Sequence, residues 1–114
     1  MSNFLILELC DNDYGHDLKE ALEELVLETE NVQDHTVQTI KSFVIEHVIF
    51  QHKKWDILFR NCDFDEERSR SYLTNHLKVY WSEKFPLHYY EGRPVDHDGG
   101  SVCLNVAMSE VYLF

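Results

Sequence analysis

Apolar side chains are most continuous between residues 35 and 59, which read HTVQTIKSFVIEHVIFQHKKWDILF. Wound as a helix, this stretch gathers apolar residues three or four positions apart on one stripe, namely Val37, Ile40, Val44, Val48 and Trp55. Phe43 and Phe50 flank the stripe on one side, and Ile45 and Ile49 flank it on the other. The pattern predicts a central helix with Asp34 as its N-cap, covered by several neighbours.

The end of this helix is harder to place. The basic residues near His52 and Lys54 suit the negative end of a helix, so we expect it to stop there. Residues 55–60 then form a short strand or an extended link. The β-branched cluster VIEHVIF also admits a strand, so helix and strand both remain open for residues 45–59.

The N-terminal residues 3–10, NFLILELC, predict an interior β-strand, because apolar side chains fall on both of its faces. One face holds Leu5, Leu7 and Leu9, and the other holds Phe4, Ile6 and Cys10. A polar loop follows, and a helix is expected from about Gly15 to Thr29. Its apolar face is formed by Leu18, Ala21, Leu22, Leu25 and Val26.

The second half of the chain predicts one more helix and then strands. The spacing of Asp63 and Glu66 is that of a capping box, which starts a helix that runs to about Glu83. That helix places Leu73, Leu77, Tyr80 and Trp81 on one face, and Pro86 stops it. The tail from residue 87 to residue 114 has strand character, with Val102, Leu104, Val106 and Met108 alternating with Cys103, Asn105 and Ala107. Residues 111–114 either continue this strand or form a last one.

These elements predict an α+β fold: an N-terminal strand, two or three helices with a central apolar helix, and C-terminal antiparallel strands that pair beside the first strand. A length of 114 residues fits a single compact domain, 1–114. The three cysteines form no CxxC pair, and the N-terminus lacks a secretory signal. We therefore expect a cytoplasmic protein with free, mostly buried thiols.

Negative charge is concentrated at one end of the sequence. The net charge is −11, and residues 1–34 hold ten acids against the single base Lys19, a net of −9, so the remaining 80 residues carry only −2. Such a surface disfavours direct binding to nucleic acid or to an anionic membrane, and it suits a basic protein partner. Solubility alone is the plainer explanation of the same charge.

Two acidic loops could bind a metal. Asp11 and Asp13 flank a glycine turn with Asp17, and a second cluster is formed by Asp96, His97 and Asp98. Oxygen and imidazole ligands of this kind hold divalent ions. However, the first loop breaks the calcium-loop register, and neither cluster shows the spacing of a dedicated site. Turn formation is the favoured explanation, so we expect no metal and no cofactor.

The histidines are weaker evidence for a metal site than the acidic loops. His47 and Gln51 lie on the apolar stripe of the central helix, and together with His76 they could converge inside the core. A buried histidine that is hydrogen-bonded to a neighbour is commoner than a metal ligand.

The leading functional hypothesis is a small, acidic, non-enzymatic protein-binding or regulatory module. It would present the carboxylates of Glu20, Glu23, Glu24, Glu28 and Glu30 to a basic surface. As an inhibitor, it would act as a DNA mimic that fills the nucleic-acid groove of its partner. The alternative is a metal-assisted hydrolase that uses the loops at 11–17 and 96–98. A homodimer formed through the aromatic residues is a third reading.

Overall fold

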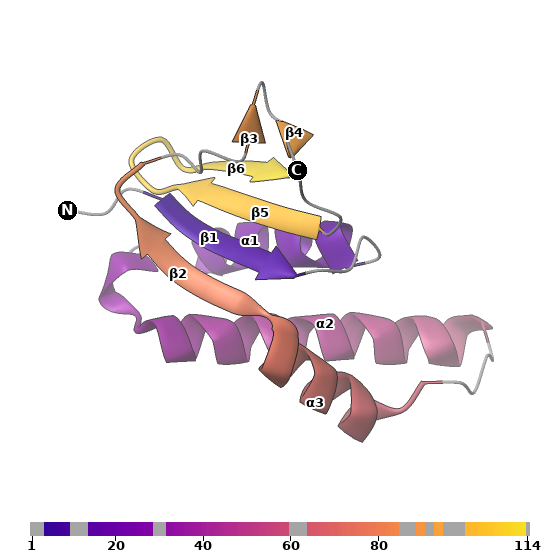
Figure 1. Ribbon diagram of the computed structural model, residues 1–114. Helices are drawn as coiled ribbons and strands as arrows, with labels where there is room; N and C mark the ends of the chain where they lie inside the picture. The colour runs from indigo at the N-terminus through magenta and orange to yellow at the C-terminus, as the bar shows by residue number, and fades with distance from the viewer. Residues whose placement is uncertain are drawn as a thin grey trace.

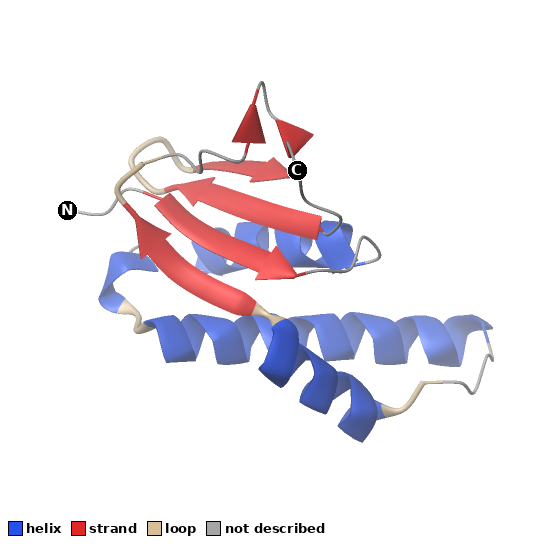
Figure 2. Ribbon diagram, viewed as in Figure 1, coloured by secondary structure: helices blue, strands red, loops and turns tan. Residues whose placement is uncertain are grey.

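The computed structural model describes residues 4–9, 14–28, 32–59, 64–84, 89–90, 93–94 and 100–113. In chain order the elements are β1 (Phe4–Leu9), α1 (Gly15–Glu28), the 3₁₀ turn η2 (Val32–Asp34), α2 (Val37–Phe59), α3 (Glu66–His76), β2 (Lys78–Ser82), β3 (Tyr89–Tyr90), β4 (Arg93–Pro94), β5 (Gly100–Asn105) and β6 (Glu110–Leu113). The predicted α+β class is confirmed, with an N-terminal strand, three helices and C-terminal antiparallel strands (Figure 2).

The main sheet has the strand order β2-β1-β5-β6, with antiparallel neighbours throughout. β1 is an interior strand, as its two apolar faces predicted. Leu5, Leu7 and Leu9 are fully buried on the face that α1 and α2 cover, α1 over β5 and β6 and α2 over β2 (Figure 1). They share one core with residues of both helices and the other strands, including Leu18, Leu22, Val44, Val48, Val79 and Leu104.

The prediction of a helix running to Glu83 is wrong. α3 ends at His76, the backbone turns extended at Leu77 (φ −75°, ψ 123°), and Lys78–Ser82 pairs with β1. β5 pairs along one edge of β1 and leaves the backbone groups of the other edge to be paired, and KVYWS is rich in strand-forming residues. In the strand, Val79 lies opposite Leu7 and Trp81 lies opposite Leu5. Pairing with a distant strand therefore outweighed the helical spacing.

The start of α3 also differs from the prediction. Its N-cap is Asp65 rather than Asp63, and the Asp65 carboxylate accepts a hydrogen bond from the Arg68 backbone N–H at 3.1 Å. The capping contact therefore lies two residues later than the capping-box spacing indicated.

The bounds of α2 need two corrections. The helix begins at Val37, where Thr36 Oγ1 accepts a hydrogen bond from the Thr39 N–H at 3.1 Å, so Thr36 makes the capping contact expected of Asp34. It continues to Phe59 instead of stopping near His52 or Lys54, because residues 55–59 contain neither glycine nor proline. Although α2 has 23 residues, no described helix is long and apolar enough to cross a membrane.

Only the first half of α2 is a central helix. Its buried residues are Ile40, Val44, Ile45, Val48 and Ile49. Beyond them Phe50 and Trp55 are each 62% exposed, although both were expected in the buried region of the helix. The C-terminal end of α2 runs past α1 and the sheet, toward the right of Figure 1. The apolar residues of α2 therefore continue beyond the part of the helix that packs into the core.

β5 ends earlier than the alternation predicted. Residues 106–109 form a turn, and Ser109 has a left-handed backbone with φ of 54°. Met108 is consequently 63% exposed instead of lying in a strand. β6 then pairs back on β5, so the C-terminal residues form a separate last strand, which is one of the two predicted outcomes.

Candidate functional site: the acidic face of α1

α1 is attached to α2 by a row of polar contacts along one edge of the helix pair. Asp17 Oδ2 lies 2.6 Å from His52 Nε2, and Glu24 Oε2 lies 2.6 Å from His47 Nδ1. Between them, Gln51 Nε2 donates to Glu20 Oε1 at 3.3 Å. We call these three pairs the polar ladder. Because the residue numbers rise along α1 as they fall along α2, the ladder fixes the two helices as antiparallel neighbours.

The Glu24–His47 rung lies partly inside the core. The His47 side chain is only 8% exposed and stacks on Phe43 with ring centroids 6.3 Å apart, whereas the Glu24 side chain is 42% exposed. Within the described residues, His47 Nε2 is buried and has no hydrogen-bond partner. An Nδ1–H that donates to the carboxylate leaves Nε2 as a bare acceptor, which costs less than burying a second, unsatisfied N–H. In the neutral ring, the geometry therefore favours the tautomer with its proton on Nδ1.

The Asp17–His52 rung lies beside a row of aromatic rings. The His52 ring lies 5.3 Å from that of Tyr14 and meets that of Phe64 edge-on at 6.4 Å. Tyr14 in turn stacks on Tyr72 of α3 at 6.0 Å. These contacts join the start of α1, the second half of α2 and the middle of α3, so this rung is a structural junction among the three helices.

The structure divides the five glutamates predicted to bind a partner. Glu20 and Glu23 are exposed on α1, with Glu23 lying 3.9 Å from Lys19 one turn earlier. Glu24 is half-buried and tied to His47. Glu28 is the last residue of α1 and its side chain is not described, and Glu30 lies outside the described residues.

Within the described part of the chain, few cations lie close to the carboxylates of α1. Among the described side chains, Lys19 supplies the only lysine or arginine nitrogen within 4.0 Å of an α1 carboxylate. The ladder partners of α1 are histidines and a glutamine. Glu20 and Glu23 therefore keep a negative charge that the described cations elsewhere in the fold leave largely uncompensated.

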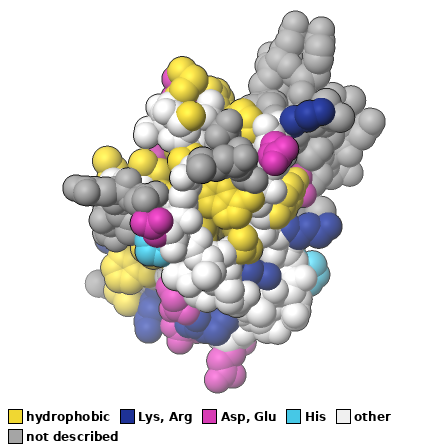
Figure 3. Space-filling view, turned by 90° about the vertical axis from the view of Figure 1, so that its left-hand side faces the viewer, with side chains coloured by type: hydrophobic (Ala, Val, Ile, Leu, Met, Phe, Trp, Pro, Cys, Tyr) yellow, Lys and Arg dark blue, Asp and Glu magenta, His cyan; other side chains and the backbone are white. Residues whose placement is uncertain are grey.

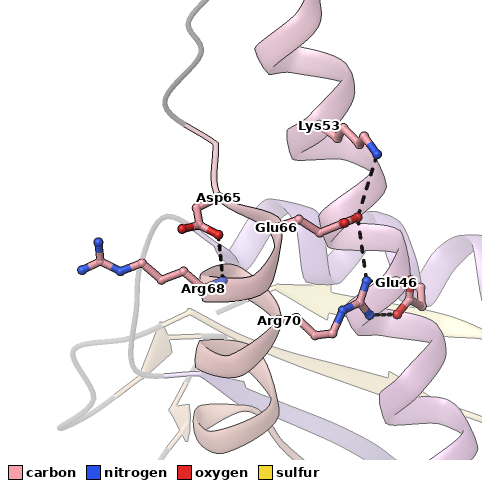
Figure 4. A network of polar contacts seen from close by, with 6 residues as sticks. All are labelled: Glu46, Lys53, Asp65, Glu66, Arg68 and Arg70. Carbon is pink, nitrogen blue, oxygen red and sulfur yellow. Dashed lines mark hydrogen bonds and ion pairs between the residues drawn. The ribbon is translucent and has the colours of Figure 1, made fainter.

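Basic residues later in the chain pair with other acids instead. Arg70 of α3 contacts Glu46 of α2 and lies 3.9 Å from Glu66, which in turn lies 4.0 Å from Lys53 (Figure 4). Figure 4 also shows that the Arg68 side chain points away from this network. On the face shown in Figure 3, acidic, basic and apolar side chains are interspersed. This network therefore pairs Lys53 and Arg70 with acids of α2 and α3, so these two basic residues are not paired with the carboxylates of α1.

The metal-binding candidates Asp11, Asp13, Asp96, His97 and Asp98 all lie outside the described residues. Within the ranges that the structure describes, no three His, Cys, Asp or Glu side chains gather closely enough to hold a metal ion. The histidines whose convergence the sequence left open have separate partners. His76 is exposed and stacks on Tyr72 at 4.3 Å, whereas His47 pairs with Glu24.

Sequence reasoning missed the polar ladder, although a signal for it existed. Asp17, Glu20 and Glu24 are spaced three or four residues apart, as along one edge of a helix, and so are His47 and Gln51 of the central helix, whereas His52 is five residues from His47. Matching these two edges requires knowing that the helices are antiparallel neighbours, which only the fold supplies.

Among the described residues, the two groups with shifted pKa values lie on β5 and β6. Burial raises the pKa of the Cys103 thiol to about 11, so this free cysteine stays protonated and unreactive at neutral pH, as a buried thiol was predicted to be. Cys10 and Cys62 lie outside the described residues. The hydrogen bond from the Tyr112 hydroxyl to Glu110 raises the pKa of that tyrosine above its ordinary value. Both groups are therefore held in their protonated, non-nucleophilic forms.

Comparison with known proteins gives no family: no family model matches the chain, and no match is found among curated proteins or solved structures. The functional conclusion therefore rests on the charge and geometry of α1.

Proposed function

We propose that this chain is a small, acidic, non-enzymatic module that binds a basic surface on another protein through the outer face of α1. The contact residues are the exposed Glu20 and Glu23, and Glu28 and Glu30, which follow them in the sequence, add to the same negative charge; Glu24, which pairs with His47, is not part of the contact. Recognition is electrostatic, so the charge steers association and sets its salt dependence.

The observation that carries this proposal is the uncompensated charge of α1. Glu20 and Glu23 are exposed, and Lys19 of the same helix, which pairs with Glu23, is the only described lysine or arginine in an ion pair with either. Had Arg70 and Lys53 lain against α1 instead of Glu46 and Glu66, the helix would have had little field to offer a partner. Rigid presentation supports the same proposal, because the ladder and the buried face hold α1 in place.

A partner whose basic surface normally binds nucleic acid is the sharper version of this proposal. A row of carboxylates on a rigid helix can occupy a groove lined by lysine and arginine, because such a groove is built for repeated negative charge. The module would then inhibit its partner by competing with nucleic acid for the same groove.

The test is capture of partners from a cell extract by the immobilised full chain, in about 50 mM and about 500 mM salt. We expect a specific basic protein to bind at low salt and to be lost at high salt. Replacing both exposed carboxylates, Glu20→Gln and Glu23→Gln, should weaken its affinity by about fivefold or more, mainly through slower association. Release of the captured protein by short duplex DNA would support the groove-blocking version.

A matched control removes the same charge elsewhere. Glu67→Gln with Glu83→Gln also changes two exposed acids to amides, and neither carboxylate takes part in the ion pairs found among the described residues. The control should leave binding within about twofold, because it changes net charge but not α1. Equal losses for both double variants, or binding that does not respond to salt, would refute the proposal.

A further inference from the structure

Histidines make two of the three ion-pair contacts found between described side chains and the carboxylates of α1. The helix contains five acids and a single lysine, a net charge of −4 when its own histidine is neutral. In the polar ladder, His52 lies 2.6 Å from Asp17, and His47 lies 2.6 Å from Glu24. Histidine is the side chain that ordinarily changes its charge between about pH 5 and pH 8. The charge of the acidic face can therefore respond to pH.

His52 is the rung of the ladder that is better placed to take up a second proton. Its side chain is 32% exposed, so water reaches the ring. A second proton gives the ring an N–H on both nitrogens, and neither nitrogen of His52 is among the buried polar atoms that lack a partner in the described residues. His47 differs, because a proton on its buried Nε2 would have no described acceptor. The same proton therefore costs less on His52.

Two carboxylates lie on the side of α2 that His52 occupies. Asp17 Oδ2 is in direct contact with His52 Nε2, and Asp17 belongs to the first turn of α1, where the positive end of the helix favours a negative charge. Asp56 follows His52 by one turn of α2, so it lies on the same side of that helix. Both negative charges favour a positive ring.

The other described groups around His52 do not oppose a positive ring. The rings of Tyr14, at 5.3 Å, and Phe64, at 6.4 Å, carry no charge at neutral pH, and aromatic rings attract cations. Lys53 is the next residue of α2, but its Nζ lies 4.0 Å from Glu66 of α3. Asp17 is therefore the charged group that contacts the ring directly.

A second proton on His52 changes the charge beside the contact residues of α1. The Asp17–His52 pair carries a net charge of −1 when the ring is neutral and of zero when the ring is protonated. Glu20 follows Asp17 by one turn, and its Oε1 accepts from Gln51, the residue before His52. One turn is about 5 Å, which is shorter than the Debye length of about 8 Å at physiological salt. The potential at Glu20 therefore becomes less negative.

We propose that His52 regulates the acidic face of α1, because mild acid converts its hydrogen bond with Asp17 into an ion pair and weakens the binding of a basic partner. The effect on binding rests on the proposed function, whereas the change of charge rests only on the geometry of α1 and α2. His16, which is exposed on α1, adds to the same response.

Nitrogen NMR of the full chain tests the change of charge. The His52 ring should hold one proton at about pH 8 and two at about pH 5.5, and His52→Gln identifies its signals. Asp17→Asn keeps the size of the side chain but removes its charge, so it should reduce the doubly protonated share of His52 at about pH 6.5. Circular dichroism checks that both variants keep their helices. A ring that still holds a single proton at about pH 5.5 would overturn the proposal.

Binding of a decalysine peptide in about 50 mM salt, at about pH 7.5 and pH 5.5, tests the consequence. The affinity of the unmodified chain should fall on acidification. His52→Gln keeps a hydrogen-bond donor beside Asp17 but cannot gain the charge, so it should make this fall smaller by about twofold. The matched control is His76→Gln, which removes an exposed histidine of α3 and should change the fall by less than about 1.3-fold. Equal effects of the two variants would overturn the proposal.

The proposed function and its regulation fail in different ways. Glu20→Gln with Glu23→Gln tests the function at about pH 7.5, where His52 is not involved. If this double variant binds decalysine as tightly as the unmodified chain, α1 is not the contact, and both the function and its regulation are refuted. If the double variant binds more weakly but acidification acts equally on the unmodified chain and on His52→Gln, only the regulation is refuted.

Discussion

His47 Nδ1 lies 2.6 Å from Glu24 Oε2, and this contact joins the buried side of α2 to the acidic side of α1. The imidazole is almost fully enclosed, and its Nε2 has no partner among the described residues. The Glu24 carboxylate is therefore the hydrogen-bond partner of the buried Nδ1. One of the acids predicted to face a partner instead has a structural role.

Glu24→Ala should destabilise the protein by about 1 kcal/mol, because the buried His47 N–H loses its acceptor and water reaches it only partly. Glu23→Ala is the matched control, with the same substitution one position away on an exposed ion pair with Lys19, and should cost less than about 0.5 kcal/mol. Urea unfolding measures both values. Equal values would mean that the His47 contact adds no net stability.

The same geometry predicts the tautomer of His47. Nitrogen NMR shifts of the neutral ring should show its proton on Nδ1, because Nδ1 faces the carboxylate and Nε2 is buried without a partner among the described residues. Spectra of His47→Gln identify the signal. A proton found on Nε2 would contradict the assignment of Glu24 as the acceptor.

The cap of α3 provides a third prediction. Asp65→Ala should destabilise the protein by about 1 kcal/mol, since the Arg68 N–H loses the side-chain acceptor that lies 3.1 Å away. Asp65→Asn keeps an acceptor at the same place and should cost no more than a few tenths of a kcal/mol. Thermal unfolding of the two variants compares them directly. If alanine and asparagine are equally harmful, the carboxylate acts through charge rather than as a cap.

The raised pKa of the buried Cys103 thiol predicts that the free energy of unfolding depends on pH. Its folded pKa of about 11 lies above the ordinary value of 9.0, so the unfolded thiol ionises first. Its contribution to stability is complete below about pH 9 and is lost as pH rises from 9 toward 11. Cys103→Ala should flatten that part of the stability profile, measured by urea unfolding at each pH. Site-resolved mass spectrometry should find slow alkylation of Cys103 at pH 8, and rapid labelling of the folded protein would contradict its burial.

The α2–α3 ion pairs predict a small, salt-dependent effect. Arg70→Gln removes contacts to Glu46 and Glu66 and should cost about 0.5 kcal/mol at low salt, because all three side chains are exposed. Arg68→Gln is the control, since that side chain points away from the network (Figure 4). The difference between the variants should shrink in about 1 M salt. A difference that persists there would assign the effect to packing of the arginine stem.

Elements with a regular spacing of apolar residues, bounded by residues that start or stop a helix or strand, were predictable from the sequence. Leu5, Leu7 and Leu9 alternate cleanly, and β1 is the interior strand that its two apolar faces indicated. The bounds of α1, Gly15–Glu28, lie within a residue of the prediction, because the apolar face and the polar loop before it agree. Of the candidate site, the exposure of Glu20 and Glu23 followed from the same helical period.

The three-dimensional fold decided the features for which local signals conflicted. Residues 78–82 have helical spacing with Leu73 and Leu77, but they form β2 because β1 offers a second edge that needs a partner. The fate of the acids was also non-local: Glu24 and Asp17 meet histidines more than twenty positions away, which periodicity cannot reveal. The sequence by itself determined the class of fold and the faces of its regular elements, since these depend on neighbouring residues. Strand partners and the carboxylates left exposed depend on contacts between distant segments, so only the assembled structure decides them.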